Sequence, residues 1–507
     1  MKLLRLWIGK YRVLENITIR FAASANRGLG NRSSAYALDF LVGVNGTGKS
    51  TVLRALGEIF QRLTGDSRKA NFPFEIEFML RDETKPLCIS NCDPDTAQLI
   101  GRYRIRRMGE NGEVTEEVDA IDHRLYLPQT VIAYTTGAEA EWRNGERDNI
   151  FHLGNPVEVQ KLSTEDLAIQ ELPGKPSLIT KTDRQQQPLF LFAEKAHIPT
   201  ITLCGFLTNL TLASGTKAKP LDEVLNEVKI NAFRGFSLRF RMNQTTGQRS
   251  DIWQRLGRFA TRSINVGAEY LFVYDYSSQH NAAEILRESG NGLNLYRFLA
   301  DLQKSNVLIE VNLFIERTKP DRRDEKTITS PLHLFEWLSD GEQNFVGRMC
   351  LFTLFSGIDA LILLDEPEVH FNDYWKRQIV HFIDQVFRAS TAAEQSHTSH
   401  LLISTHSSIA LTDAHSDDII RMERDDINTQ RATKPRFQTF GADPSDIMVH
   451  IFDAPQPNGE YSVQRIKARI DEARQGRISK GDLEQDLKSI APGYWSYRVR
   501  RELIRQQ

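Results

Sequence analysis

The residues with the clearest chemical potential lie in a glycine-rich segment near the start of the chain. Gly43-x-x-x-x-Gly48-Lys49-Ser50 has the spacing of a P-loop, in which glycines let the backbone curl around phosphate groups. The N–H groups of a following helix would face the negative charge, Lys49 would reach the β- and γ-phosphates, and the Ser50 hydroxyl would ligate Mg²⁺. The segment therefore predicts ATP and Mg²⁺ as cofactors. The expected nucleotide-binding residues of this segment are Gly43, Asn45, Gly46, Thr47, Gly48, Lys49, Ser50 and Thr51.

A pair of acids follows a short apolar run far downstream. Residues 361–364 are all Leu or Ile, and Asp365 and Glu366 come directly after them. An acid at the end of such a strand fits a Walker B site, in which Asp365 would hold Mg²⁺ directly or through water. Glu366 would then orient and deprotonate the attacking water. Without the P-loop, the same residues would simply predict a strand end with two solvated acids.

Two further motifs flank this pair in the sequence. Ser339-Asp340-Gly341-Glu342 precedes an apolar helix and is compatible with an ordinary N-cap. It also resembles the signature motif of ABC-type ATPases, whose serine hydroxyl and glycine N–H contact the γ-phosphate bound to a second protomer. Ser404-Thr405-His406 follows a second apolar strand, and His406 matches the switch histidine of that class. The resemblance implies that Lys49, Glu366 and His406 are catalytic. It also implies that Ser339, Gly341 and Glu342 contact nucleotide.

Other segments are similar to a narrower group. Asp365–His370 has the DEPExH form of SMC-like and OLD-like ATPases, and Ile8–Leu14 resembles a strand turn of that group. Segments 127–137, 439–443 and 493–498 resemble restriction-system-associated AAA ATPases of prokaryotic defence systems, which include Septu PtuA-like proteins. This resemblance implies an ATPase subunit of an anti-phage complex. It would form at least a head-to-head homodimer and control a separate effector nuclease, HNH-type or other, encoded nearby.

The same resemblance suggests two further positions, each with an ordinary alternative. Gln129 is a candidate for the Q-loop glutamine that senses Mg²⁺, which adds it to Ser50 and Asp365 as an expected metal ligand; it could equally be a surface-loop residue. Asn372-Asp373 could occupy the D-loop, or these could equally be ordinary surface residues.

Two alternative functions would use a similar ATPase head. An OLD-like protein with its own nuclease needs a Toprim site, built from a strand ending in Glu and a later Asp-x-Asp pair. About 100 residues follow His406, and the pairs Asp417-Asp418 and Asp425-Asp426 lack that context. A DNA-repair or SMC-type ATPase would carry long heptad arms, which this sequence does not contain.

The hydrophobic pattern indicates the elements that would position these motifs. Residues 37–42 form an apolar run before the P-loop, and residues 51–60 place apolar side chains at helical spacing after it, which argues against a chance glycine loop. Residues 361–364 and 401–404 predict buried parallel strands. Further strands are expected at 3–8, 16–21, 74–80, 127–134, 236–240, 271–274 and 307–315, and helices at 189–192 and 203–212.

We therefore expect an α/β fold with an ABC-type P-loop NTPase head, which has a mixed sheet and flanking helices. The N-terminal lobe of the head would span 1–150 and the C-terminal lobe 331–430. A mostly helical insertion with some strands would occupy 151–330, since a polar stretch rich in turn residues at about 138–185 predicts a change of unit. Residues 431–507 would form a C-terminal helical extension.

Composition excludes several other classes of protein. The 507 residues contain 64 Lys and Arg against 66 Asp and Glu, and this net charge of −2 excludes a globally basic nucleic-acid coat. No run approaches about 18 consecutive apolar residues, and the first residues lack a signal-peptide pattern, so we expect a cytoplasmic protein without membrane contact. Four cysteines are too few for a disulfide framework.

Two weaker patterns remain. His397-x-x-His400 has no cysteine partners, so a metal role is not expected there. The C-terminus combines arginines with aromatic residues, which predicts either a surface for nucleic acid or an acidic partner, or a solvated helix face. These residues are Tyr494, Trp495, Tyr497, Arg498, Arg500, Arg501 and Arg505.

Overall fold

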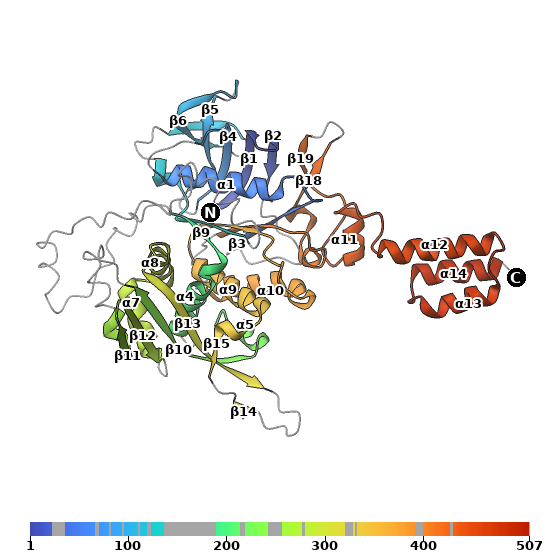
Figure 1. Cartoon of the computed structure of the whole chain (residues 1–507). Coiled ribbons are helices and arrows are strands. Elements are labelled where there is room, and N and C mark those ends of the chain that lie inside the picture. Colours follow the sequence, from blue (N-terminus) through green and yellow to red (C-terminus); the bar gives the residue numbers. More distant parts are fainter. Residues whose placement is uncertain are drawn as a thin grey trace, which may run out of the picture. The chain divides into compact units, whose positions relative to one another are not determined.

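The chain divides into two compact units, Met1–Gly441 and Ala442–Gln507 (Figure 1). The polar stretch expected at about 138–185 lies outside the described residues. None of the described helices is both long and apolar enough to cross a membrane. The computed structural model describes residues 1–22, 36–65, 70–80, 83–93, 96–109, 112–118, 123–135, 189–212, 219–241, 256–275, 279–319, 328–329, 332–390, 399–425 and 429–505.

A seven-stranded sheet with the order β19-β18-β3-β17-β16-β8-β9 forms the centre of the first unit. Its strands run parallel except at the β18–β19 edge. Every residue of β8, β16 and β17 is buried, as expected for a parallel sheet that is covered on both faces. The strands are β3 (Tyr36–Val42), β8 (Thr130–Thr135), β9 (Leu189–Ala193), β16 (Ala360–Asp365), β17 (Ser399–Ser404), β18 (Ile419–Arg424) and β19 (Gln430–Thr433).

Helix α1 (Lys49–Thr64) lies between this sheet and a second, antiparallel sheet (Figure 1). One apolar cluster joins side chains of both sheets to α1, which explains why α1 is buried on most of its circumference. In β4, buried Phe and Ile alternate with half-buried Glu, the pattern of a strand with one face on a core. The antiparallel sheet has the order β2-β1-β4-β5-β6-β7. Its strands are β1 (Lys2–Tyr11), β2 (Leu14–Arg20), β4 (Phe74–Met79), β5 (Leu87–Cys92), β6 (Leu99–Met108) and β7 (Val114–Val118).

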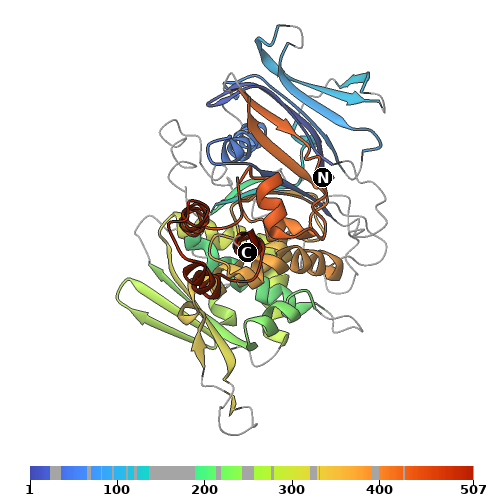
Figure 2. The same cartoon turned by 90° about the vertical axis from the view of Figure 1, so that its right-hand side faces the viewer.

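The remaining helices of the first unit include α9 (Asp340–Phe355), which is buried along most of its length. It packs against α10 (Asp373–Ser390) and α4 (Ile198–Thr211). These helices and a third sheet lie on the opposite side of the central sheet from the antiparallel sheet (Figure 1, Figure 2). The α9 helix therefore ties the central sheet to the segment inserted between β9 and β15.

We predicted this inserted segment to be mostly helical with some strands. Its described part combines helices with an antiparallel sheet of order β11-β12-β10-β13-β14, in which β15 also pairs with β13. The run 189–192, predicted as helix, is strand β9 and extends the central sheet, so this prediction was wrong. The elements are α5 (Asp222–Glu227), β10 (Ile230–Arg241), β11 (Arg262–Val266), β12 (Glu269–Asp275), α7 (Gln279–Ser289), α8 (Gly292–Lys304), β13 (Leu308–Lys319), β14 (Ile328–Thr329) and β15 (His333–Leu334).

The second unit is helical and begins later than the extension predicted at 431–507. Strand β19 pairs antiparallel with β18 and belongs to the central sheet, so the division falls after Gly441 instead of before residue 431. A small apolar core, which includes Ile470, Leu483 and Val499, joins the last three helices. The helices are α11 (Pro444–His450), α12 (Glu460–Arg474), α13 (Lys480–Ser489) and α14 (Tyr494–Arg505).

Most of the remaining predictions of secondary structure are confirmed, as is the α/β class. The runs 37–42, 361–364 and 401–404 form β3, β16 and β17, and the segment after the P-loop forms α1. The antiparallel strands β5, β6 and β7 were not predicted.

Candidate functional site

The predicted motifs meet because three parallel strands end at the same edge of the central sheet. Strand β17 lies between β3 and β16, with Ser404 opposite Leu41 on one side and Asp365 on the other. The P-loop follows β3, the acidic pair closes β16, and the switch segment follows β17. Ligands of open α/β sheets bind at this carboxyl edge. Residues more than 300 positions apart in sequence are therefore neighbours.

The P-loop forms the turn between β3 and α1 that its glycines predict. Gly46 and Gly48 have φ values of 78° and 100°, in the left-handed region that other residues rarely adopt. The first turn of α1 contains no acidic residue, and Gly48 offers no side chain that could cap it. The N–H groups in the first turn of α1 lack acceptors within the helix, so they form a positive helix end that suits a phosphate.

Lys49 extends along the inside of this loop. Its ammonium donates hydrogen bonds to the carbonyl oxygens of Gly43 at 3.0 Å and Val44 at 3.2 Å. Burial lowers the pKa of Lys49 to about 8, although the negative charges of Glu366 and Asp365 oppose the shift. The ammonium is thus a buried cation that a phosphate would stabilise.

Asp365 accepts two hydrogen bonds from serines on different elements. Ser50 Oγ on α1 donates to its Oδ1 at 2.8 Å, and Ser404 Oγ on β17 donates to the same oxygen at 2.6 Å. Neighbouring ligands of octahedral Mg²⁺, each about 2.1 Å from the ion, lie about 3 Å apart. The spacing between Ser50 Oγ and Asp365 Oδ1 fits that requirement, and both are the oxygen ligands that Mg²⁺ prefers. Ser404, whose role we had not predicted, donates a second hydrogen bond that helps to fix this carboxylate.

Glu366 has an unusual backbone for a residue with a side chain. Its φ of 49° lies in the left-handed region, and its N–H donates to both the carbonyl and the hydroxyl oxygen of Ser404, each at 3.1 Å. Strained residues of this kind concentrate at functional sites. The conformation turns the side chain toward His406, whose Nε2 lies 3.5 Å from Glu366 Oε1.

The environment shifts the pKa values of both of these groups. Burial, followed by the charge of Asp365, raises the pKa of Glu366, which makes its carboxylate a stronger base. Burial, followed by the charge of Lys49, lowers the pKa of His406, so its imidazole is neutral near pH 7. A carboxylate and a neutral imidazole thus lie side by side, each about one third exposed.

A second contact connects the loops that follow β16 and β17. The Thr405 hydroxyl donates a short hydrogen bond to the buried Glu368 carboxylate and accepts one from the N–H of Ser407 at 2.9 Å. Burial raises the pKa of Glu368, although the bond from Thr405 opposes this. Thr405 and Glu368, which lie close in sequence to His406 and Glu366, are therefore joined by a hydrogen bond. Both residues lie inside the sequence motifs, but nothing in the sequence indicated that they form a hydrogen bond with each other.

The signature residues form the N-terminus of α9. Ser339 caps the helix, and Glu342 completes a capping box by accepting hydrogen bonds from the N–H and hydroxyl of Ser339, both at 2.9 Å. Arg317 donates to the Glu342 carboxylate at 2.5 Å. Burial favours a higher pKa for Glu342, but the bonds from Ser339 and the charge of Arg317 outweigh it and lower the pKa. Gly341 lies so close to the next loop that an added Cβ would be 2.7 Å from His370 O.

Gln129 lies away from these residues, which contradicts its expected role as a metal ligand. It immediately precedes β8, whose first residue, Thr130, pairs with the first residue of β16, Ala360. Asp365 pairs with Thr135 at the other end of the same strands. At about 3.3 Å per residue, the length of the strand separates Gln129 from the carboxyl edge by roughly 20 Å. Gln129 is an exposed residue at the amino edge of the sheet.

Two other candidate positions have structural partners. Asn372 Oδ1 accepts the N–H of Trp375 at 2.8 Å at the start of α10, so its side chain caps a helix. His400 is fully buried: its Nδ1 accepts the Leu3 N–H at 2.9 Å, and its Nε2 lies 3.0 Å from Asp39 Oδ2. Both ring nitrogens of His400 are used, as expected for a structural histidine, and His397 lies outside the described residues.

Arg424 is a residue of the site that the motifs did not reveal. It ends β18, the strand on the other side of β3, and its Nη2 donates a 2.6 Å hydrogen bond to the carbonyl oxygen of Gly46. The side chain is exposed. An arginine thus borders the P-loop, where its charge would favour a bound polyphosphate.

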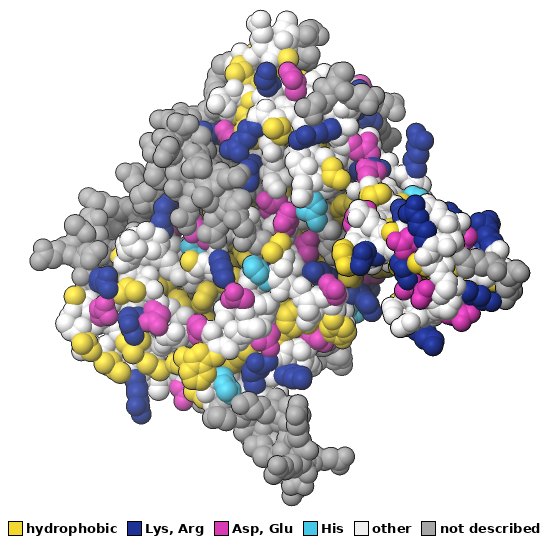
Figure 3. All heavy atoms as spheres, turned by 45° about the vertical axis from the view of Figure 1, so that its right-hand side comes forward, with side chains coloured by type: hydrophobic (Ala, Val, Ile, Leu, Met, Phe, Trp, Pro, Cys, Tyr) yellow, Lys and Arg dark blue, Asp and Glu magenta, His cyan; other side chains and the backbone are white. Residues whose placement is uncertain are grey.

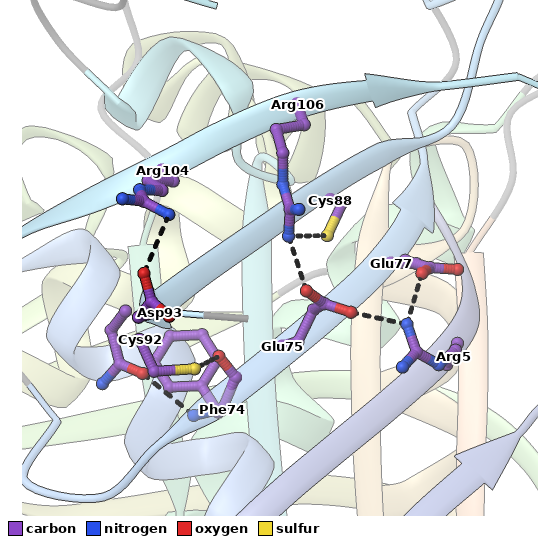
Figure 4. A network of polar contacts seen from close by, with 10 residues as sticks. Arg5, Phe74, Glu75, Glu77, Cys88, Cys92, Asp93, Arg104 and Arg106 are labelled. Atoms are coloured by element: carbon purple, nitrogen blue, oxygen red, sulfur yellow. Dashed lines mark hydrogen bonds and ion pairs between the residues drawn. The ribbon is translucent and has the colours of Figure 1, made fainter. Parts of the chain in front are cut away.

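A separate polar network lies on the antiparallel sheet (Figure 4). Within the described ranges, Glu75, Glu77 and Cys88 are the one group whose ligand atoms are close enough to share a metal ion. Arg5 bonds both carboxylates at 2.6 and 2.7 Å, and Arg106 bonds Glu75 at 2.5 Å. Burial raises the pKa of Cys88 to about 12, so its thiol is protonated. The arginines and the neutral thiol make this an ion-pair network that does not suit a metal.

Comparisons with known proteins add little to this geometry. No protein-family model and no curated protein matches the chain. Among solved structures, the chain is similar to the SMC head domain from Thermotoga maritima, with 12% identity and a TM-score of 0.35 over 86% of this chain and 100% of that one. It is also similar to an SMC head bound to the C-winged helix domain of ScpA, with 13% identity and a TM-score of 0.32 over 85% and 97%. At these TM-scores, neither similarity supports a functional conclusion.

Proposed function

We propose that this chain binds ATP with Mg²⁺ and hydrolyses it. The observation that carries the proposal is the meeting of Lys49, Ser50, Asp365, Glu366 and His406 at one edge of the sheet. Two independent segments supply the phosphate-binding loop and the acidic pair, and the hydrogen bond between Ser50 and Asp365 joins them. This combination of groups has a direct use in phosphoryl transfer to water.

Each residue would have a defined task. The P-loop N–H groups and Lys49 would bind the β- and γ-phosphates and stabilise the charge that develops during transfer. Ser50 and Asp365 would hold Mg²⁺, which supplies charge neutralisation between the phosphates when bound. Glu366 would accept a proton from the attacking water, and His406 would orient that water and the γ-phosphate. Arg424 would contribute positive charge at the border of the loop.

We further propose that two copies bind ATP head to head. The signature residues support this: among the described residues, no hydrogen bond joins Ser339, Gly341 or Glu342 to the P-loop of the same chain. The start of α9 carries Asp340, whose side chain is 64% exposed. A second protomer could therefore place its bound nucleotide against this helix end.

The sequence resemblance suggests the biological setting. We propose that the ATPase is a regulatory or scaffold subunit of an anti-phage defence complex and that ATP-dependent dimerisation controls a separate effector nuclease. Among the described residues, the acidic cluster around Glu75 would need to lose its arginine partners to bind a metal, so it gives no support to a nuclease site on this chain.

Substitution of Glu366 by Gln tests the proposed chemistry. We expect turnover of ATP to fall by about 10²-fold or more, the usual contribution of a general base, while ATP binding persists and ATP-bound dimers accumulate. Replacement of Lys49 by Ala should instead abolish binding. Turnover that survives in Glu366→Gln would refute the assignment of the base, and unchanged affinity in Lys49→Ala would refute the nucleotide site.

A further inference from the structure

Helix α14 in the second unit exposes an aromatic and basic face. Ser496, Val499 and Glu502 point into the unit, whereas Tyr494, Tyr497 and Ile504 have exposed fractions of 59%, 59% and 66%. Positions separated by three, four or seven residues share one side of a helix. Tyr494, Tyr497, Arg498, Arg501, Ile504 and Arg505 therefore form one surface, which we name the α14 face.

Net positive charge in the second unit is greatest on this helix. α14 contains four arginines and one glutamate, whereas α12 contains four basic residues and three acids, and α13 contains two lysines and three acids. The single acid of α14, Glu502, is buried and lies 3.1 Å from Arg474 and 3.7 Å from Arg505, so its charge is already compensated. The surface of the unit accordingly displays many Lys and Arg side chains (Figure 3). The α14 face thus suits an anion, although the whole chain has a net charge of −2.

Aromatic rings and cations alternate along the same surface. Arg498 donates to the Tyr494 hydroxyl at 2.8 Å, and its guanidinium lies 5.7 Å from the centre of that ring. Next to them, Lys467 of α12 lies 5.7 Å from the centre of the Trp495 ring. These contacts keep flat rings and positive charges together at the surface. A peptide would use the charges but would need aromatic or apolar side chains of its own to use the exposed rings, whereas every unpaired base offers a flat ring face.

We propose that the α14 face binds single-stranded nucleic acid, with arginines on the phosphates and tyrosine rings stacked on bases. Unpaired bases expose the ring faces that such stacking needs, and every base offers one, so the contact would be largely independent of sequence. This activity goes beyond the ATPase and does not depend on it. It would give a chain of near-zero net charge a local contact with nucleic acid.

Fluorescence anisotropy tests the proposal. It would measure binding of a labelled oligo(dT) of about 20 nucleotides to the full-length chain at several salt concentrations. Each phosphate contact contributes about 0.7 to the slope of log K against log salt for single strands. Replacement of Arg498 and Arg501 together by Gln should therefore reduce the slope by about 1.4. Replacement of Tyr494 and Tyr497 together by Ala should weaken binding about tenfold or more with the slope unchanged.

Matched controls separate this surface from general electrostatics and from the ATPase. Replacement of Lys480 and Lys488 on α13 by Gln removes the same charge from the same unit and should leave oligonucleotide affinity within about twofold. The Lys49→Ala variant should bind the oligonucleotide with unchanged affinity. A failure of the ATPase proposal can therefore be distinguished from a failure of the nucleic-acid proposal. Three results would overturn the proposal. The first is that the oligonucleotide does not bind at low salt, and the second is that the α13 control loses as much affinity as the α14 variants. The third is that duplex DNA binds as tightly as the single strand and the tyrosine replacements have no effect.

Discussion

The buried ammonium of Lys49 predicts that ATP binding weakens as the pH rises toward 9. Burial lowers the pKa of Lys49 to about 8, and the charges of Glu366 and Asp365 offset only part of that effect. A lysine with a lowered pKa is charged below that pKa and neutral above it. Because a triphosphate needs the charged form, affinity should be greatest below about pH 8 and fall as the pH rises through this value.

The size of the effect follows from the fraction of Lys49 that carries its proton. With a pKa of about 8, roughly nine molecules in ten are charged at pH 7 and about one in ten at pH 9. The apparent Kd equals the intrinsic Kd divided by the competent fraction. The Kd for ATP should therefore rise about tenfold between about pH 7 and pH 9.

Calorimetric titration of the Mg²⁺ complex of a non-hydrolysable ATP analogue into the unmodified chain would measure this change without turnover, and it keeps the Glu366 charge that contributes to the pKa of Lys49. The matched control is Lys49→Arg with the same analogue, since a guanidinium stays charged throughout this range. Whatever its absolute affinity, the control should show a Kd that does not change with pH. A Kd that is constant from pH 7 to 9 with Lys49 present, or one that rises equally in the Lys49→Arg control, would refute the reasoning.

Two further predictions concern other parts of the site. Gly341→Ala should destabilise the first unit by about 1–3 kcal/mol, because the new Cβ would lie 2.7 Å from the backbone oxygen of His370. Denaturant unfolding would measure it against Gly481→Ala, whose Cβ would make an ordinary contact at 3.7 Å; equal losses in the two variants would contradict the packing argument. Arg424→Ala should raise the Kd for ATP about tenfold with kcat unchanged, because it removes a cation whose Nη2 lies 2.6 Å from Gly46 O. An unchanged Kd, measured by calorimetry on the folded variant, would remove Arg424 from the site.

The predicted site residues that the structure brings together belong to motifs contained in short segments. Eight consecutive positions are enough to define a P-loop, and an apolar run followed by Asp365 and Glu366 defines a strand end. Ser404 and Arg424 escaped prediction because their roles depend on which strands are neighbours of β16 and β3. Sequence order does not reveal those neighbours.

The errors have similar physical causes. Gln129 was assigned by its position in a motif, but it precedes β8, and in a parallel sheet the two ends of a strand lie at opposite edges. All four residues of the run 189–192 are apolar, so their pattern fits a buried helix and a buried strand equally well. Only the pairing of this run with β8 shows that it is a strand. The sheet of the insertion depends on long-range pairing between β10 and β13, which local patterns do not report.

The position of β3 has a consequence for synthesis of the chain. This strand has β17 on one side and β18 on the other, and both begin at or after residue 399. A nascent chain that has left the ribosome only through residue 150 would thus carry β3 with two unpaired edges, and α1 would have the antiparallel sheet but only part of the central sheet to pack against. Unpaired apolar edges favour aggregation, and contacts between such distant segments form slowly. The central sheet around β3 can be completed only after the last strands of the first unit are made, so we expect that a split of the gene before residue 399 would yield two pieces that need each other to form this sheet.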